Sequence, residues 1–242
     1  MSFLRDAART VWPAAGDRHG PLAPLLVTLT VATGIVDAVS YLELGHVFVA
    51  NMTGNVVFLG FALAGAGGLS VSASLVALGS FLLGALAGGW LGAHYHAHRG
   101  HLLRAANAIQ VVLLAAAVLV AALTHEPLAR DARYLLIVLL ALAMGVQNAA
   151  ARRLAVPDLT TTVLTLTLTG LASDASIVGG PGSKLGRRVI AVSAMLLGAF
   201  LGGLLALRVA IAVPLGVALA LVASTGLAVH SLSRSPSAWT RG

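Results

Sequence analysis

The residues of this chain that could do chemistry are polar side chains set within or beside long apolar stretches. Asp37 is the one acidic residue in the apolar run over residues 22–42, and the block Asn51, Thr53 and Asn55 follows it. Placing a carboxylate within a membrane span costs about 2.5–3.5 kcal/mol on insertion scales, so we expect a functional position. Asp37 could carry a proton, ligate a cation or pair with an arginine. A hydrogen-bonded structural aspartate is the alternative.

A looser copy of this arrangement follows in the second half of the chain. Asp37 lies three residues after Gly34, and Asn148 lies three residues after Gly145. The two glycines are 111 positions apart (34 to 145). Asn148 keeps the hydrogen-bonding capacity of Asp37 without its charge, and Gln147 adds a second amide. The site therefore need not be symmetric.

Together these side chains form a predicted substrate site. They offer amides, hydroxyls and one carboxylate for hydrogen bonds to a small polar solute, with one arginine (residue 152 or 153) to balance charge or to pair with Asp37. The predicted site comprises Asp37, Tyr41, Asn51, Thr53, Asn55, Gln147, Asn148, Arg152, Thr161, Thr162 and Thr165.

Two short apolar segments must position much of this site. Residues 52–64 and 160–171 are shorter than the roughly 20 residues that a spanning helix needs. Asn51 could cap the first short helix through its side chain, and Asp158 or Thr160 could cap the second. Two helices that start at mid-depth would direct two positive dipole ends at one point, which suits an anionic or dipolar ligand. Ordinary loop caps at the membrane surface are the alternative.

The composition is that of an integral membrane protein. Hydrophobic residues make up 58% and charged residues 10% of the chain, and the mean hydropathy is +0.95, whereas soluble domains carry about a quarter charged residues. We predict an all-α, polytopic membrane helix bundle with about six full spans besides the two short helices. The predicted spans are residues 22–42, 71–93, 105–123, 134–150, 189–207 and 213–229.

The order of these segments repeats, which predicts two inverted repeats, each with a discontinuous half-helix. Gly84 and Gly88 match Gly198 and Gly202 at a shift of 114 (84 to 198), close to the shift of the first motif. Such glycines indicate close helix packing, either between the repeats or between two protomers. We expect a cytoplasmic tail over residues 1–21, a first transmembrane repeat over 22–124, a second over 134–230, and a disordered tail over 231–242.

The distribution of Lys and Arg predicts the orientation. If both short segments return to the side from which they came, a cytoplasmic N-terminus puts 12 Lys and Arg inside and 3 outside. If both cross, the split is 10 to 5. The positive-inside rule favours the first topology, with both termini in the cytoplasm. Three crossings per repeat invert the halves, an arrangement that places polar sites near the midplane of many secondary transporters.

Residues outside the predicted substrate site give weaker indications of function. Glu43 and His46 could gate the site or relay protons, or could be interfacial residues. The histidines at positions 94, 96, 98 and 101 lie in a basic loop without cysteine or aspartate, so we expect a lipid-facing cytoplasmic loop and no metal.

Cysteine is absent from the chain, which excludes disulfides and thiolate chemistry. No hydrolase elbow, phosphate loop or zinc helix occurs, so we expect neither an enzyme nor a cofactor. The net charge of +7 lies in connections and tails, which indicates anionic lipid rather than nucleic acid as the partner.

Three blocks resemble a known family. They are Asp37-Ala-x-Ser-Tyr41, Phe48-x-Ala-Asn-Met-Thr-Gly-Asn55, and Gly145-x-Gln-Asn-Ala149 with Arg152 and the threonines that follow. These blocks resemble the YoaK-like family of small bacterial membrane proteins, whose function is unknown, and the resemblance covers residues 22–229. It implies a bacterial inner-membrane protein with six or seven spans. The layout is also similar to the cores of the sulfate-permease and nucleobase-transporter superfamily. The chain has about half the length expected there, which favours a homodimer.

We therefore expect a secondary transporter or permease for a small polar solute, including an anionic one, with the bilayer and the solute as partners. A non-transporting membrane scaffold or accessory subunit, whose polar centre only holds the fold together, is the alternative. A membrane enzyme ranks third, for want of a nucleophile and base.

Overall fold

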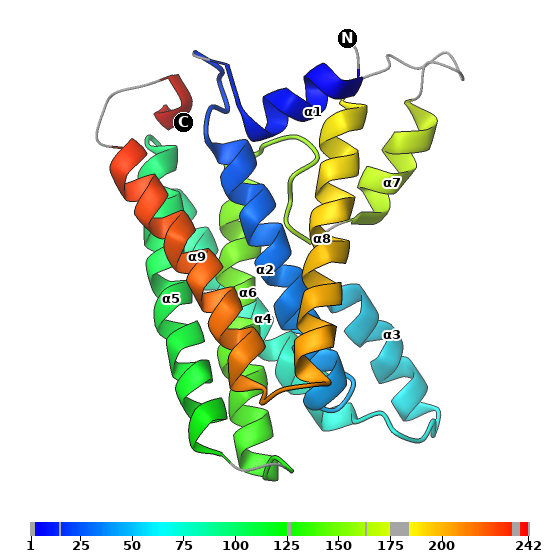
Figure 1. The fold of residues 1–242 in the computed structure, drawn as a ribbon. Coiled ribbons are helices and arrows are strands. Elements are labelled where there is room, and N and C mark those ends of the chain that lie inside the picture. The colour runs from blue at the N-terminus through cyan, green and yellow to red at the C-terminus, as the bar shows by residue number, and fades with distance from the viewer. Residues whose placement is uncertain are drawn as a thin grey trace.

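The computed structural model describes residues 3–14, 16–124, 127–162, 164–174, 184–233 and 238–241, which form an all-helical bundle (Figure 1). Six helices are long and apolar enough to cross a bilayer: α2 (Leu22–Glu43), α4 (Val71–His94), α5 (Arg99–Leu123), α6 (Arg130–Leu154), α8 (Leu185–Ala206) and α9 (Ala212–Leu232). Two shorter apolar helices accompany them, α3 (Met52–Leu63) and α7 (Leu164–Ser173). The predicted all-α membrane bundle with six spans and two short helices is confirmed.

The helices α2 and α6 form the centre of the bundle. In their most apolar stretches 67% and 61% of the residues are buried, against 22–33% in the other four long helices. The outer helices expose large apolar side chains, such as Trp90 on α4 and Phe200 on α8. Apolar side chains on the outer faces of spanning helices are expected where lipid is the solvent.

Glycines bring α4 and α6 into backbone contact. A Cβ atom added at Gly84 would lie 2.2 Å from the carbonyl oxygen of Leu142, and one at Gly145 would lie 2.2 Å from that of Phe81. No real Cβ can approach a backbone oxygen so closely. Only glycine at these positions therefore permits the observed helix spacing.

The same contact recurs between α8 and α2. An added Cβ at Gly198 would lie 2.1 Å from the oxygen of Val31, and one at Gly34 would lie 2.5 Å from that of Met195. Each partner matches its counterpart on the first pair of helices at the shifts of 111 and 114 found in the sequence (31 to 142, 81 to 195). The glycines thus pack helices of one chain together, and the alternative of a protomer contact is not needed to explain them.

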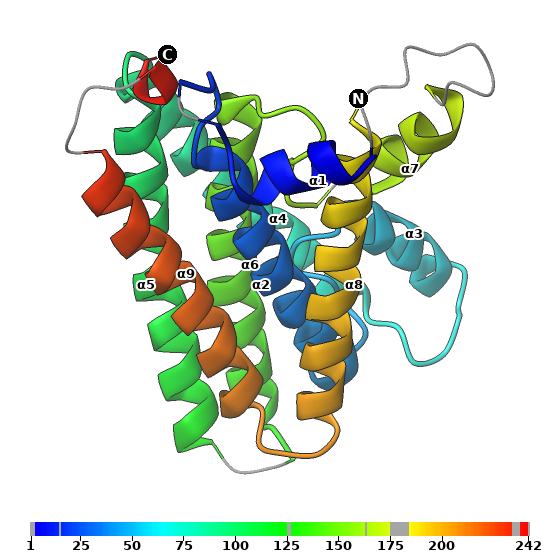
Figure 2. The ribbon, with the colours of Figure 1, turned by 45° about the horizontal axis from the view of Figure 1, so that its top comes forward.

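The two short helices begin in the middle of the bundle and run to opposite ends. After α2 ends at the lower end in Figure 1, the chain rises over residues 44–51 and α3 runs back down. After α6 ends at the upper end, the chain descends over residues 155–162 and α7 runs back up (Figures 1 and 2). Packing on α4 and on α8 holds α3 and α7, respectively.

The first and last described elements lie at the upper end. Helix α1 (Phe3–Val11) packs on α8, where Gly186 leaves room for the backbone of Phe3 and Ala7 (Figure 2). The 3₁₀ helix η2 (Ala238–Thr240) buries Trp239. Helix α9 extends to Leu232, into the segment 231–242 for which we predict a disordered tail, and the disorder of this tail stays a prediction.

Candidate functional site

Asp37 organises the stretch that leads into α3. Its Oδ1 oxygen accepts hydrogen bonds from the backbone N–H groups of Val49 at 3.0 Å and Ala50 at 2.8 Å. Asp37 is only 8% exposed, and the two amides would otherwise be buried without partners. The alternative of an ion pair between Asp37 and Arg152 or Arg153 is wrong, since the carboxylate instead bonds to the backbone before α3.

Asn55 fixes the same stretch from the first turn of α3. Its side-chain oxygen accepts from the Phe48 N–H at 2.8 Å, and its Nδ2 donates to the Phe48 carbonyl at 2.6 Å. Asn51 occupies the N-cap position of α3, but its side chain makes no capping bond. The predicted side-chain cap at Asn51 is therefore wrong, and this amide is left free for another partner.

A cavity of about 810 Å³ lies between the starts of α3 and α7. Seven of the eleven predicted site residues line it, and they come from α2, α6 and the two short helices with their preceding loops. These seven are Asp37, Tyr41, Asn51, Thr53, Asn148, Thr162 and Thr165. The structure thus has a cavity between the two motifs, and its role as a substrate site stays a prediction.

Aromatic rings form the wall of the cavity next to α3. Tyr41 and Phe48 stack with their ring centroids 5.1 Å apart, and Phe58 lies 5.8 Å from Phe48. Phe81 of α4 and Met195 of α8 also line the cavity. Polar groups against an apolar wall are the usual composition of a small-molecule site, in which a few hydrogen bonds orient the ligand.

On the α7 side, Asn148 holds the loop that precedes the helix. Its oxygen accepts a hydrogen bond from the Thr162 hydroxyl, and its Nδ2 donates to the Met144 carbonyl at 2.9 Å. Thr161 lies outside the cavity lining: its hydroxyl is buried without a partner and its φ is +65°. Asp158 and Thr160 precede α7 by several residues, so the predicted capping of this helix by either is wrong.

Gln147 faces the core of the bundle and does not line the cavity. It accepts a hydrogen bond from Gln110 of α5 at 2.7 Å and donates to the hydroxyl of Thr33 of α2, also at 2.7 Å. These buried hydrogen bonds link α5, α6 and α2. Arg152 likewise lies outside the cavity lining, on an exposed position near the upper end of α6, so it does not balance charge inside.

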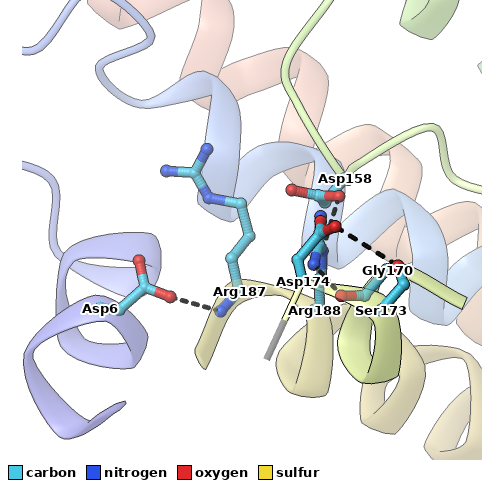
Figure 3. Close-up of polar contacts among 7 residues, drawn as sticks. All are labelled: Asp6, Asp158, Gly170, Ser173, Asp174, Arg187 and Arg188. Carbon is cyan, nitrogen blue, oxygen red and sulfur yellow. Dashed lines mark hydrogen bonds and ion pairs between the residues drawn. The ribbon is translucent and has the colours of Figure 1, made fainter. Parts of the chain in front are cut away.

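Arg188 is a polar residue that the sequence analysis did not single out. This side chain is 8% exposed and holds three segments together: it donates to Asp158 at 3.0 Å, to Asp174 at 2.7 Å and to the carbonyl of Gly170 (Figure 3). The hydrogen bond from Arg188 holds the pKa of the Asp174 carboxyl below its usual value, so this partner is ionised at neutral pH. The only sequence signal was an arginine at the edge of an apolar run, which also fits a loop.

The remaining predicted candidates lie at the periphery. His46 is exposed and contacts the ring of Tyr41 edge-on at 5.2 Å, so it touches a lining residue without lining the cavity itself. Glu43 lines a separate pocket near Arg133 at the lower end. His98 caps α5 by accepting from the N–H of His101, with which it stacks.

Comparison with known proteins identifies the family of this chain. Residues 25–228 match the family described as "Protein of unknown function (DUF1275)". The chain belongs to this family. The DUF1275 match runs from α2 into α9 and so includes both motifs and the whole cavity.

The chain is also similar to "UPF0700 transmembrane protein YoaK" of Bacillus subtilis (strain 168). It is 37% identical over 153 residues, which cover 63% of this chain and 66% of the relative. The predicted resemblance to YoaK-like proteins is confirmed, and the chain is a multi-pass membrane protein. No solved structure matches it, so the likeness in layout to the sulfate-permease and nucleobase-transporter superfamily stays a prediction.

Proposed function

We propose that this DUF1275 protein is a secondary transporter or permease for a small polar solute. The observation that carries the proposal is the cavity of about 810 Å³ into which the starts of α3 and α7 project from opposite ends of the bundle. Broken helices that meet at mid-depth are costly in lipid unless they line a wet cavity or are buried in protein. Secondary transporters place their substrates at such points.

The contacts of the helices support an inverted repeat. The pairs α2–α8 and α6–α4 use glycines that correspond at nearly one shift, and α3 packs on α4 as α7 packs on α8. Under this proposal α3 and α7 are re-entrant half-helices. Among the described residues, the arginines at positions 130, 133 and 208 lie at the lower end of the bundle, and the other Lys and Arg lie toward the upper end. This asymmetry supports a cytoplasmic upper end in the bacterial inner membrane.

The lining favours a solute that both donates and accepts hydrogen bonds. Asn51 and Thr165 present an unbonded amide and a hydroxyl, and Asp37 and Tyr41 are the ionisable groups among the described lining residues. Asp37 binds the backbone just before α3, whereas Asp158, which lies near the start of α7, is paired with Arg188. An anionic group of the solute would therefore lie nearer α7. Asp37 is the candidate coupling or proton-carrying residue.

Uptake into proteoliposomes tests the proposal. A panel of labelled small polar solutes, neutral, zwitterionic and anionic, is screened, and the transported one is repeated with Asn51→Ala and Thr165→Ala. Both variants should lower uptake without lowering the melting temperature, because neither side chain forms a hydrogen bond with the described part of the chain. Ser224→Ala is the control, since that hydroxyl bonds only within α9 and lies outside the cavity. Wild-type rates of uptake in both cavity variants would remove these residues from the mechanism.

A non-transporting scaffold or accessory subunit is the second candidate. It is favoured by the polar groups that the fold itself uses, since Asn55 and Gln147 bond to the chain rather than line the cavity. Under it, no solute of the panel is taken up and a stable partner co-purifies. A catalytic reaction forms no part of either proposal, and the homodimer stays a prediction.

A further inference from the structure

A second cavity lies at the upper end of the bundle, and it shares no lining residue with the substrate cavity. Its volume is about 430 Å³. Four arginines from four separate segments line it: Arg18 before α2, Arg99 at the start of α5, Arg153 at the end of α6, and Arg241 after η2. We call this cavity the arginine pocket.

No carboxylate offsets these charges within the part of the chain that the structure describes. The lining contains no Asp or Glu, and the ion pairs found among described residues all belong to Arg188. Asp17 interacts electrostatically with His19, but it does not line the pocket. Its Oδ1 accepts hydrogen bonds from the backbone N–H groups of His19 and Gly20. Among the described residues, four like charges are thus gathered without a carboxylate in the lining, which favours a ligand that supplies negative charge.

Neutral acceptors hold Arg99 in place. Its Nη1 donates to the carbonyl of Arg18 at 3.1 Å, and its Nη2 donates to the carbonyl of Leu154 at the end of α6. His19 lies 3.2 Å from the same nitrogen, and burial together with the charge of Arg99 lowers the pKa of His19. Neutral acceptors thus fix the geometry of Arg99 without offsetting its charge, as in a pre-organised anion site.

Arg153 is positioned by packing. A Cβ added at Gly92 would lie 3.1 Å from Cγ of Arg153, so the aliphatic part of this side chain rests directly on α4. The guanidinium belongs to an exposed residue and lines the pocket. Planar guanidinium groups present paired N–H donors that match the oxygens of a phosphate group.

We infer that the arginine pocket binds a phosphate-bearing anion at the membrane surface. The phosphate comes from the headgroup of an anionic phospholipid or from a soluble phosphate compound. Basic pockets between spanning helices bind lipid headgroups, and the upper end is the end rich in Lys and Arg. The inference does not depend on transport, because no residue of the pocket lines the substrate cavity.

The test compares binding of defined lipids and of inorganic phosphate to the full chain in detergent. Native mass spectrometry counts bound phosphatidylglycerol or phosphatidylcholine, and inorganic phosphate is titrated as a competitor. Arg153→Gln is the pocket variant, because this arginine forms no bond on which the fold depends. Arg104→Gln is the control, since it removes the same charge from an exposed residue of α5 outside the pocket lining.

We expect phosphatidylglycerol to bind more tightly than phosphatidylcholine, and Arg153→Gln to weaken its binding about fivefold relative to Arg104→Gln. Competition by millimolar inorganic phosphate would assign the site to soluble phosphates, and its absence would assign it to the lipid headgroup. Equal affinity for both lipids with no phosphate binding, or equal losses in the two variants, would overturn the inference.

Discussion

The side chain of Asn55 binds both backbone polar groups of Phe48, donating to its carbonyl at 2.6 Å and accepting from its N–H at 2.8 Å. The side-chain amide thus provides for Phe48 the two backbone hydrogen bonds that a neighbouring β-strand would otherwise provide. This pairing, together with the hydrogen bonds that Asp37 accepts from Val49 and Ala50, fixes the depth in the bundle at which α3 begins.

The first prediction separates the two asparagines of the motif. Asn55→Ala leaves the partly buried N–H and C=O of Phe48 without these partners and should destabilise the protein by roughly 1–3 kcal/mol. Asn51→Ala, which loses no side-chain bond, should leave stability nearly unchanged. Thermal unfolding in one detergent measures both, and similar melting temperatures for the two variants would contradict this assignment.

The second prediction concerns the helix-contact glycines. Gly84→Ala and Gly198→Ala each force a Cβ against a backbone oxygen and should destabilise the bundle by about 1–3 kcal/mol. Gly89→Ala is the matched control on α4, because its added Cβ meets nothing within 4 Å. Thermal unfolding again provides the readout. Equal melting temperatures for Gly84→Ala and Gly89→Ala would show that the spacing of α4 and α6 is not set as described.

The third prediction divides the roles of Asp37. Asp37→Asn keeps an oxygen that accepts from Val49 and Ala50, so the fold should persist while any charge-coupled uptake is lost. Asp37→Leu removes the acceptor and should destabilise by roughly 2–4 kcal/mol through the two orphaned amides. Uptake and melting temperature are measured on both. If Asp37→Asn transports at the wild-type rate, the carboxylate serves the fold alone.

The fourth prediction tests the contacts of Arg188. Asp174→Asn weakens the hold of Arg188 on the end of α7, so a probe on this helix should become more accessible. The chain contains no cysteine, and Thr165→Cys therefore provides a single labelling site in the cavity lining. We expect labelling about twofold to fivefold faster in the Asp174→Asn background. Asp131→Asn, at the start of α6, is the control and should leave the rate unchanged.

The fifth prediction follows from His19. Burial and the nearby Arg99 lower its pKa below the usual 6.5, so the folded chain binds fewer protons than the unfolded chain. Stability should then fall as the pH drops below about 6.5. His19→Gln, which can still accept from Arg99, should lose less stability between pH 7.5 and 5 than the wild type. Melting curves at both pH values measure the difference, and parallel losses would contradict the assigned environment.

Much of the architecture could be predicted from the sequence. Span number follows from hydropathy and length, because lipid requires about 20 apolar residues per crossing. Close helix packing at Gly84 and Gly198 follows from their matched spacing, whereas the helices that these glycines meet could not be predicted. Both signals are local in the chain and independent of side-chain direction.

The roles within the motifs could not be predicted. Asn51 and Asn55 are chemically identical, and only the height of the loop before α3 decides which one faces the cavity. Arg188 binds Asp158 and Asp174, which lie 30 and 14 residues before it in the chain. Gln147 meets Gln110 and Thr33 only after three helices have come together. Such pairings depend on distance in space, which residue type and spacing do not encode.

The glycine contacts also limit how this molecule can change shape. Helices α2 and α8 interlock backbone to backbone, as do α4 and α6, so neither pair can slide without a steric clash. The central helices α2 and α6 touch one another in few places, whereas α5 and α9 join the two halves along an extensive seam. If the chain transports a solute as proposed, alternate opening of the cavity would proceed by rocking of two rigid bodies about the contact between α5 and α9.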